Sequence, residues 1–143
     1  MKFAGRLLGL DLGRKRVGVA VSDETAAIAS PLATIAIRGR ADLAAQVSAL
    51  VREHRVVAVV TGHPSKLDGS DSSFTPEARR LTEFLRGSLE VPVYEYDERF
   101  TSAIAQRALH AAGRKLKGHR ADIDKIAAAV MLNDFLTRHA DRN

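Results

Sequence analysis

The stretch LLGLDLGRKRVGVAVSD, Leu7–Asp23, constrains the fold of this chain more than any other part of it. It predicts a β-hairpin made of an apolar strand Leu7–Leu12, a basic turn Gly13–Arg16 and a second apolar strand Val17–Val21. Asp11 falls near the end of the first strand, among leucines that belong in a core. Burying an ionised carboxylate is costly unless it is paired, hydrogen-bonded or bound to a metal ion. The rest of the chain must therefore supply a partner for Asp11.

The segments after the hairpin alternate between strand and helix patterns. Short β-branched runs predict three more strands, Pro31–Ile37, Val56–Val60 and Val91–Tyr96. Helical spacing of apolar residues predicts helices at Ala41–His54, from near Pro76, from an N-cap at Thr101 to about Ala112 with Gly113 closing it, and from about Asp122 to His139. Between these elements we expect a polar loop, Ser65–Ser73, and a basic loop, Arg114–Arg120.

This order of elements is typical of an α/β fold. Three consecutive strands followed by alternating helices and strands predict a mixed sheet, antiparallel first and parallel later, with helices on both faces. The length of 143 residues predicts a single domain over residues 1–143.

Composition narrows the chemistry that such a domain could perform. The chain has no cysteine, so any metal would be held by oxygen or imidazole, and a carboxylate-rich site suits Mg²⁺ or Mn²⁺ better than zinc. The net charge of +5 favours an anionic partner such as nucleic acid. No apolar run approaches the roughly 20 residues of a membrane span, and the N-terminus does not have the pattern of a signal peptide. We therefore expect a cytoplasmic protein without a membrane partner.

Two further carboxylates are candidate neighbours of Asp11. Glu98 follows a predicted strand, and ligands of α/β sheets gather at the carboxyl ends of parallel strands. Asp124 lies in the first turn of the last predicted helix, on the face that packs inward, whereas Asp122 is better placed as the helix cap. Each acid also has a simpler explanation: backbone amides for Asp11, an ion pair with Arg99 or another basic residue for Glu98, and the helix dipole for Asp124. If the three converge, two divalent cations would relieve their repulsion and support phosphodiester hydrolysis.

Several motifs occur in order along almost the whole chain. They are the hairpin GLDLGRKRVGVAVSD, SPLATI (Ser30–Ile35), G-x-P followed by DGS (Gly62, Pro64 and Asp68–Ser70), DERFT (Asp97–Thr101) and IDKIAA (Ile123–Ala128). As a set, with matching gaps, they resemble the YqgF/RuvX family. That resemblance implies a ribonuclease H-like fold and a nuclease that either processes the 5′ end of 16S rRNA or resolves Holliday junctions.

The resemblance also implies roles for individual residues. Asp11, Glu98 and Asp124 match the catalytic, metal-binding acids of the family, which would hold two Mg²⁺ or Mn²⁺ ions with Asp11 bridging them. Two positions depart from the family pattern: His63 stands where an apolar residue usually precedes the proline, and Phe100 replaces the leucine after DER. Neither change touches the acids. A role for His63 in substrate contact or proton transfer stays open, as does any assistance of Asp124 by Asp122.

Basic residues lie beside each acid in the sequence. We expect these to bind substrate: Lys15, Arg16, Arg99, Arg114, Lys115, Lys117 and Arg120. They fit a path that guides a phosphate backbone toward the metals, although the basic loop has a second explanation as a solvated segment. Aromatic residues are few and are not interleaved with basic ones, so we expect recognition of backbone shape and charge rather than of bases.

Three classes of function compete. The first is a metal-dependent nuclease acting on RNA or DNA. RNA is favoured because no exposed apolar stripe predicts the dimer that a junction resolvase needs, and ribosomal precursor particles are then a candidate partner. The second is a nucleotide-binding protein of the actin and sugar-kinase type, which needs two such domains, so we expect no nucleotide cofactor. The third, a non-catalytic nucleic-acid binder or ribosome assembly factor, has no use for three clustered acids. Cut polarity, preferred metal and oligomeric state stay open.

Overall fold

A computed structural model describes residues 3–64 and 74–140 of the chain. Its centre is a five-stranded sheet in the order β3-β2-β1-β4-β5. The strands are β1 (Arg6–Asp11), β2 (Arg16–Ser22), β3 (Ala29–Ala36), β4 (Val56–Gly62) and β5 (Val93–Glu95). The β1–β2 and β2–β3 pairs are antiparallel, whereas β1–β4 and β4–β5 are parallel. The predicted mixed sheet and the predicted hairpin are therefore confirmed.

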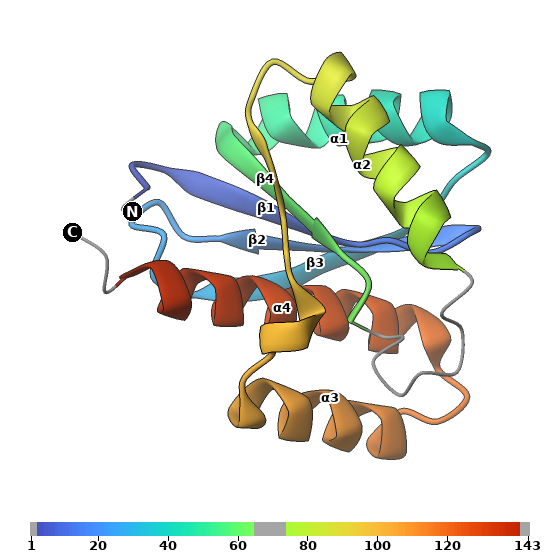
Figure 1. Ribbon diagram of the computed structural model, residues 1–143, viewed down its shortest axis with the longest axis vertical. Helices are drawn as coiled ribbons and strands as arrows, with labels where there is room; N and C mark the ends of the chain where they lie inside the picture. Colours follow the sequence, from blue (N-terminus) through green and yellow to red (C-terminus); the bar gives the residue numbers. More distant parts are fainter. Residues whose placement is uncertain (1–2, 65–73, 141–143) are drawn as a thin grey trace.

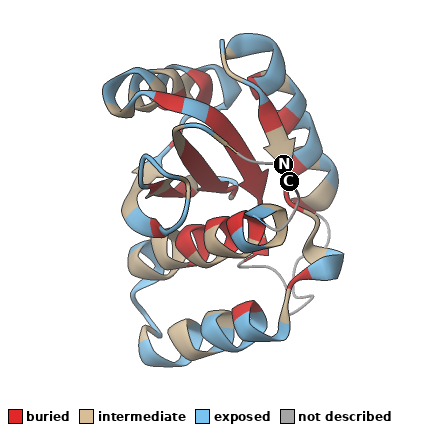
Figure 2. Cartoon of the chain, turned by 90° about the vertical axis from the view of Figure 1, so that its left-hand side faces the viewer, coloured by how far each residue is buried: buried red, intermediate tan, exposed pale blue. Residues whose placement is uncertain are grey.

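Helices cover both faces of this sheet (Figure 1). On one face lie α1 (Arg40–His54) and α2 (Thr75–Ser88), and on the other lies α4 (Arg120–Ala140). The remaining helix, α3 (Ala103–Lys115), packs against the outer side of α4 rather than against the sheet, and Figure 2 shows it largely exposed. No helix in the described ranges combines the length and the apolar character needed to cross a membrane.

The alternation of side chains along β1 decides which residues face which helices. Leu8 and Leu10 belong to the core beneath α1 and α2, whereas Leu7 belongs to the core beneath α4. Gly9 shares the face of Leu7, since a Cβ atom there would lie 3.0 Å from Leu132 of α4. By the same period of two, Asp11 faces α4 as well.

The ends of α3 and α4 differ from the sequence prediction. Thr101 is not the N-cap of α3; that position is taken by Ser102, whose hydroxyl accepts from the Ala105 amide at 3.1 Å. Thr101 is buried, and its hydroxyl is 2.9 Å from the carbonyl oxygen of Glu98. The cap is therefore the hydroxyl that tertiary packing leaves available. Gly113 does not end the helix either.

The predicted basic loop Arg114–Arg120 was wrong at both ends. Arg114 and Lys115 form the last turn of α3, where positive charge is favourable near the helix C-terminus, and Arg120 is the first residue of α4. The left-handed turn between the helices is made by Gly118, with φ of 88°. Asp122 is likewise not a cap, because it lies inside the first turn of α4, 3.4 Å from Lys125.

The last strand is shorter than predicted. The expected run Val91–Tyr96 contributes only Val93–Glu95 to the sheet, because Pro92 has no N–H to donate. Its carbonyl still accepts from the Val59 amide at 2.9 Å, and the Tyr96 amide donates to Thr61 at 2.7 Å. The predicted loop Ser65–Ser73, which contains the DGS motif, lies outside the described residues.

Candidate active site at the carboxyl ends of β1 and β4

Asp11 is the last residue of the central strand β1 and is only 2 % exposed. Its neighbours across the sheet are both glycines: Gly18 on the antiparallel strand β2 and Gly62 on the parallel strand β4. Neighbouring strands lie about 4.8 Å apart, so the absence of two side chains lets other groups approach the sheet closely on both sides of the carboxylate.

The other two predicted acids lie over these glycines. A Cβ atom at Gly18 would meet the carbonyl oxygen of Asp124 at 1.9 Å, and one at Gly62 would meet Oε1 of Glu98 at 2.9 Å. Glu98 and the first turns of α4 thus flank Asp11 on opposite sides, each above an adjacent strand. The structure brings the three acids to one edge of the sheet, which their positions in the sequence left open.

Glu98 is held by the backbone just after β4 and not by its neighbour in sequence. It lies in a short 3₁₀ helix, η3 (Glu98–Phe100), and its Oε1 accepts from the His63 amide at 2.7 Å. The simpler explanation, an ion pair with Arg99, does not hold: Arg99 pairs with Asp97 at 2.8 Å. That hydrogen-bonded pair lowers the pKa of Asp97 and raises the pKa of Arg99.

A buried network fixes η3 against α4. The Tyr96 hydroxyl donates to Asp134 Oδ2 at 2.6 Å and lies 3.0 Å from Thr101 Oγ1. Asp134 also accepts from Arg138 at 2.9 Å, and Arg138 bonds the carbonyl of Phe100. Burial, followed by the hydrogen bond to Asp134, raises the pKa of Tyr96 well above its usual range. Because these bonds hold both ends of η3, they also set the position of Glu98.

Asp124 is paired with Arg16, the first residue of β2. Its Oδ2 accepts from Arg16 Nε at 3.0 Å, and the Asp124 side chain is 16 % exposed. Thr34 of β3 bonds the carbonyl of Ala121, which holds the start of α4 close to the sheet. Arg16, predicted to contact substrate, therefore forms an ion pair with a predicted metal ligand in this structure.

The chemistry of these donors suits a hard cation, since every candidate ligand is a carboxylate oxygen. Within residues 3–64 and 74–140, however, no three acidic or imidazole groups lie close enough together to hold one ion. In this structure the Glu98 carboxylate accepts from the His63 amide and the Asp124 carboxylate accepts from the Arg16 guanidinium. Every buried polar side-chain atom in the described part of the chain has a partner.

The predicted substrate-binding residues come from three separate places around this edge. Lys15 comes from the hairpin turn, Arg16 from the start of β2 and Arg99 from η3, while the others belong to the junction of α3 and α4: Arg114, Lys115, Lys117 and Arg120. All except Arg16 are exposed. The continuous basic loop expected from the sequence is thus divided between two helices and the turn that joins them.

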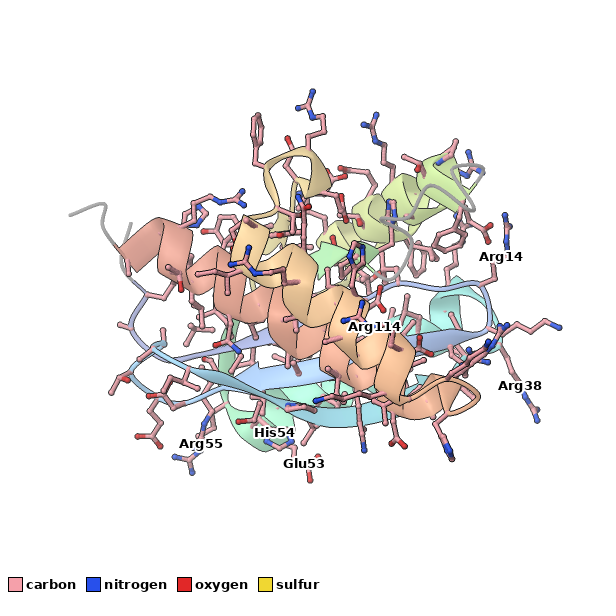
Figure 3. The ribbon with its side chains drawn as sticks, turned by 90° about the horizontal axis from the view of Figure 1, so that it is seen from below. Arg14, Arg38, Glu53, His54, Arg55 and Arg114 are labelled. Atoms are coloured by element: carbon pink, nitrogen blue, oxygen red, sulfur yellow. The ribbon has the colours of Figure 1, made fainter. Side chains whose placement is uncertain are left out.

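Sequence reasoning missed other groups at the same end. Figure 3 shows Arg14 and Arg38 projecting there, away from Glu53, His54 and Arg55. Arg14 pairs with Glu77 at 2.7 Å and lies over the Phe74 ring at 5.1 Å. These neighbours come from α2 or the residue before it, so the local sequence around Arg14 does not reveal them.

An exposed aromatic residue also went unrecognised. Phe100 is 64 % exposed, two residues after Glu98, and its ring centre lies 5.4 Å from the guanidinium carbon of Arg99. The motif DERF already contained this basic–aromatic pair. Its exposure beside an acid of the site was the missing observation.

A mixed sheet whose central strand ends in a buried aspartate, flanked by two further acids, defines the ribonuclease H-like class of folds. Two solved structures have a similar fold. The first is "T. thermophilus RuvC in complex with Holliday junction substrate", with a TM-score of 0.55 and 15% identity, covering 94% of this chain and 96% of that chain. The second is "Crystal structure of the fowlpox virus Holliday junction resolvase", with a TM-score of 0.50 and 14% identity, covering 93% of this chain and 99% of that chain.

Within this class the chain belongs to the RuvX family, described as "Holliday junction resolvase", whose sequence model matches residues 5–138. The resemblance seen in the sequence motifs is therefore confirmed. Two relatives carry the name "Putative pre-16S rRNA nuclease". One, from Roseiflexus sp. (strain RS-1), is 36% identical over 132 residues, covering 92% of this chain and 94% of its own. The other, from Anaeromyxobacter dehalogenans (strain 2CP-C), is 38% identical over 135 residues, covering 94% and 98%.

Proposed function

We propose that this protein is a divalent-metal-dependent nuclease that cuts RNA during maturation of the 5′ end of 16S rRNA. Residues 1–143 would act as one nuclease domain. The observation that carries the proposal is the position of Asp11, buried at a strand end between Gly18 and Gly62, with the backbone of Asp124 over Gly18 and the carboxylate of Glu98 over Gly62. The choice of RNA as substrate follows the names of the two relatives, whose sequences match almost the full length of the chain.

The three acids are assigned as the ligands of two Mg²⁺ or Mn²⁺ ions. When bound, such ions would activate a water molecule and stabilise the leaving oxygen of the phosphodiester. Asp11, fixed in the sheet between Gly18 and Gly62, would hold the ions together with the other two acids. Glu98 and Asp124 would do so after exchanging their present bonds to the His63 amide and Arg16.

Basic residues around the acidic edge would bind the phosphate backbone. Lys15 and Lys117 are exposed and, among the described residues, have no ion pair, so their charges can attract nucleic acid directly. Arg16, released from Asp124 when a cation takes its place, would gain a phosphate as its new partner. A ribosomal precursor as substrate would place the protein in the cytoplasm.

The test is cleavage of labelled single-stranded RNA, single-stranded DNA and a four-way DNA junction by wild type and Asp11→Asn, each with Mg²⁺, with Mn²⁺ and with EDTA. We expect metal-dependent cutting by wild type and none by the variant. Asp42→Asn is the matched control, because Asp42 lies on α1, where its carboxylate accepts from the Arg38 amide and from Gln46. Equal activity of Asp11→Asn and wild type would refute the assignment of the acids.

The same assay separates the second candidate function. A Holliday junction resolvase, the description carried by the family, has to cut two strands symmetrically and therefore needs two active sites. Preferred cutting of the junction, by a protein that sediments as a dimer, would favour DNA over RNA. Binding of all three substrates without any cutting would instead favour a non-catalytic assembly factor.

A further inference from the structure

A groove of about 530 Å³ opens beside the proposed active site. Its walls come from α2 on one side and from β5 with η3 on the other, at the carboxyl ends of β4 and β5. Glu98 lies in its wall, so the groove begins at the group that would bind metal. Pockets that bind small organic groups measure roughly 300–1,000 Å³, and this one lies within that range.

The two hydroxyl groups on the floor of the groove are already paired with each other. Thr61 and Thr82 are both buried, and their hydroxyl oxygens lie 2.9 Å apart. Thr82 also donates to the carbonyl of Ala78 at 3.0 Å. These two hydroxyl groups therefore already have hydrogen-bond partners within the protein, so specific recognition of a ligand must come from the walls of the groove.

Among the described residues, each wall presents one charged side chain that has no partner. Arg79 projects from α2 and Glu95 from β5, and neither makes a hydrogen bond or an ion pair within that part of the chain. The other charged residues of the walls differ: Asp97 and Arg99 bond each other, and Glu83 bonds Arg86. The Arg79 guanidinium, a hydrogen-bond donor on one wall, and the Glu95 carboxylate, an acceptor on the other, are therefore available to a bound ligand.

The charge of the residues lining the groove indicates what kind of ligand it can bind. The lining contains more acidic than basic side chains: four carboxylates (Glu83, Glu95, Asp97 and Glu98) and two guanidinium groups (Arg79 and Arg99). A phosphate would be repelled, because negative charge is in excess there. A neutral planar group with acceptors along one edge and donors along another would satisfy Arg79 and Glu95 together.

We propose that this groove binds an unpaired guanine base of the strand that the proposed nuclease site would cut. Guanine offers O6 and N7, which an arginine contacts in bidentate fashion, and an amino group that a carboxylate can accept from. Proteins that read RNA sequence do so mostly on unstacked bases of single strands. The proposal rests on the proposed function for its substrate, and it adds base reading, which the sequence alone did not support.

The experiment measures binding without cleavage. Fluorescence anisotropy in EDTA would compare labelled eight-nucleotide RNAs made of uridine with a single central guanosine, adenosine or cytidine. We expect the guanosine strand to bind about tenfold more tightly than the other two, since a bidentate base contact contributes discrimination of that order. Equal binding of the three strands, or binding of none, would overturn the proposal.

Two variants and two controls assign the preference to the groove. Arg79→Gln and Glu95→Gln should each reduce the preference for guanosine to about twofold or less. Arg80→Gln and Glu90→Gln, also exposed but outside the groove, should keep it. Thermal unfolding of each variant shows whether it is folded; a folded Glu95→Gln with full preference for guanosine would overturn the proposal.

The result is separable from that of the cleavage test. A preference for guanosine in a protein that cuts none of the substrates would support the proposed guanine site and refute the proposed nuclease function. Metal-dependent cutting at sites unrelated to guanosine, together with equal binding of the three strands, would support the nuclease function and refute the guanine site.

Discussion

Gly18 is the position where one added methyl group should damage both the fold and the site. It is buried in β2, opposite Asp11, and α4 crosses directly over it. In Gly18→Ala the new Cβ atom would lie 1.9 Å from the carbonyl oxygen of Asp124, 2.3 Å from its carbon and 2.9 Å from the amide nitrogen of Lys125. All three atoms are backbone, so no side chain can rotate away.

The size of the effect follows from these distances. A close carbon–oxygen contact needs about 3.3 Å, so the start of α4 must withdraw by roughly 1.4 Å. Overpacking of a core costs about 1–3 kcal/mol, and we expect the upper end, about 3 kcal/mol, because the obstructing atoms belong to a packed helix. With an m value of about 2 kcal/mol per molar urea, the midpoint of unfolding should fall by about 1.5 M.

Urea unfolding followed by circular dichroism measures this shift, and the cleavage assay measures its consequence. Withdrawal of α4 takes Asp124 away from Asp11, so metal-dependent cutting should fall even where the variant is folded. Gly113→Ala is the matched control: it lies inside α3, the methyl group it would gain has nothing within 4 Å, and the variant should gain about 0.5–1 kcal/mol of stability. A midpoint for Gly18→Ala within 0.3 M of wild type (roughly 0.6 kcal/mol at that m value) would refute the close packing of α4 on β2.

Two further predictions concern groups with shifted pKa values. Asp23 accepts from the amides of Ala27 and Ile28, each at 2.9 Å, and from Thr25, and these bonds hold its pKa far below the ordinary value of 3.8. Its contribution to stability is therefore present above pH 3.8 and is lost as the pH falls below that value through the folded-state pKa. A carboxyl NMR titration should find Asp23 still ionised at about pH 3, and a midpoint near 3.8 would contradict the bonded loop. Tyr96→Phe should destabilise the protein by about 2 kcal/mol, because a buried hydrogen bond to a charged group is lost, and a loss below about 0.5 kcal/mol would count against the network. Since the pKa of Tyr96 is raised, the stabilisation by its neutral form persists below pH 10 and is lost at higher pH, so absorbance titration of wild type should show one of the two tyrosines ionising only with unfolding.

Local pattern was sufficient for most of the fold. Period-two alternation and β-branched runs predicted the hairpin, the buried strand β4 and the change from antiparallel to parallel pairing. Local pattern failed where the end of a helix depended on tertiary contacts. Thr101 and Ser102 are equally good caps in sequence, and only burial of Thr101 against Tyr96 decided between them. Gly113 reads as a helix end, yet α3 continues because Gly118 makes the turn.

For the site, the sequence by itself determined which chemical groups are available. An aspartate among core leucines, two further acids at element ends, and the absence of cysteine already limited the choice to carboxylate chemistry at a strand edge. Only the tertiary structure decided their neighbours. The bond between Arg16 and Asp124 joins residues 108 positions apart, and the groove at Arg79 and Glu95 is formed by two elements that no short pattern relates. Residue types and periodicity are local properties of the chain, whereas the pairing of charges and the shape of a cavity arise when α2 and α4 pack on opposite faces of one sheet.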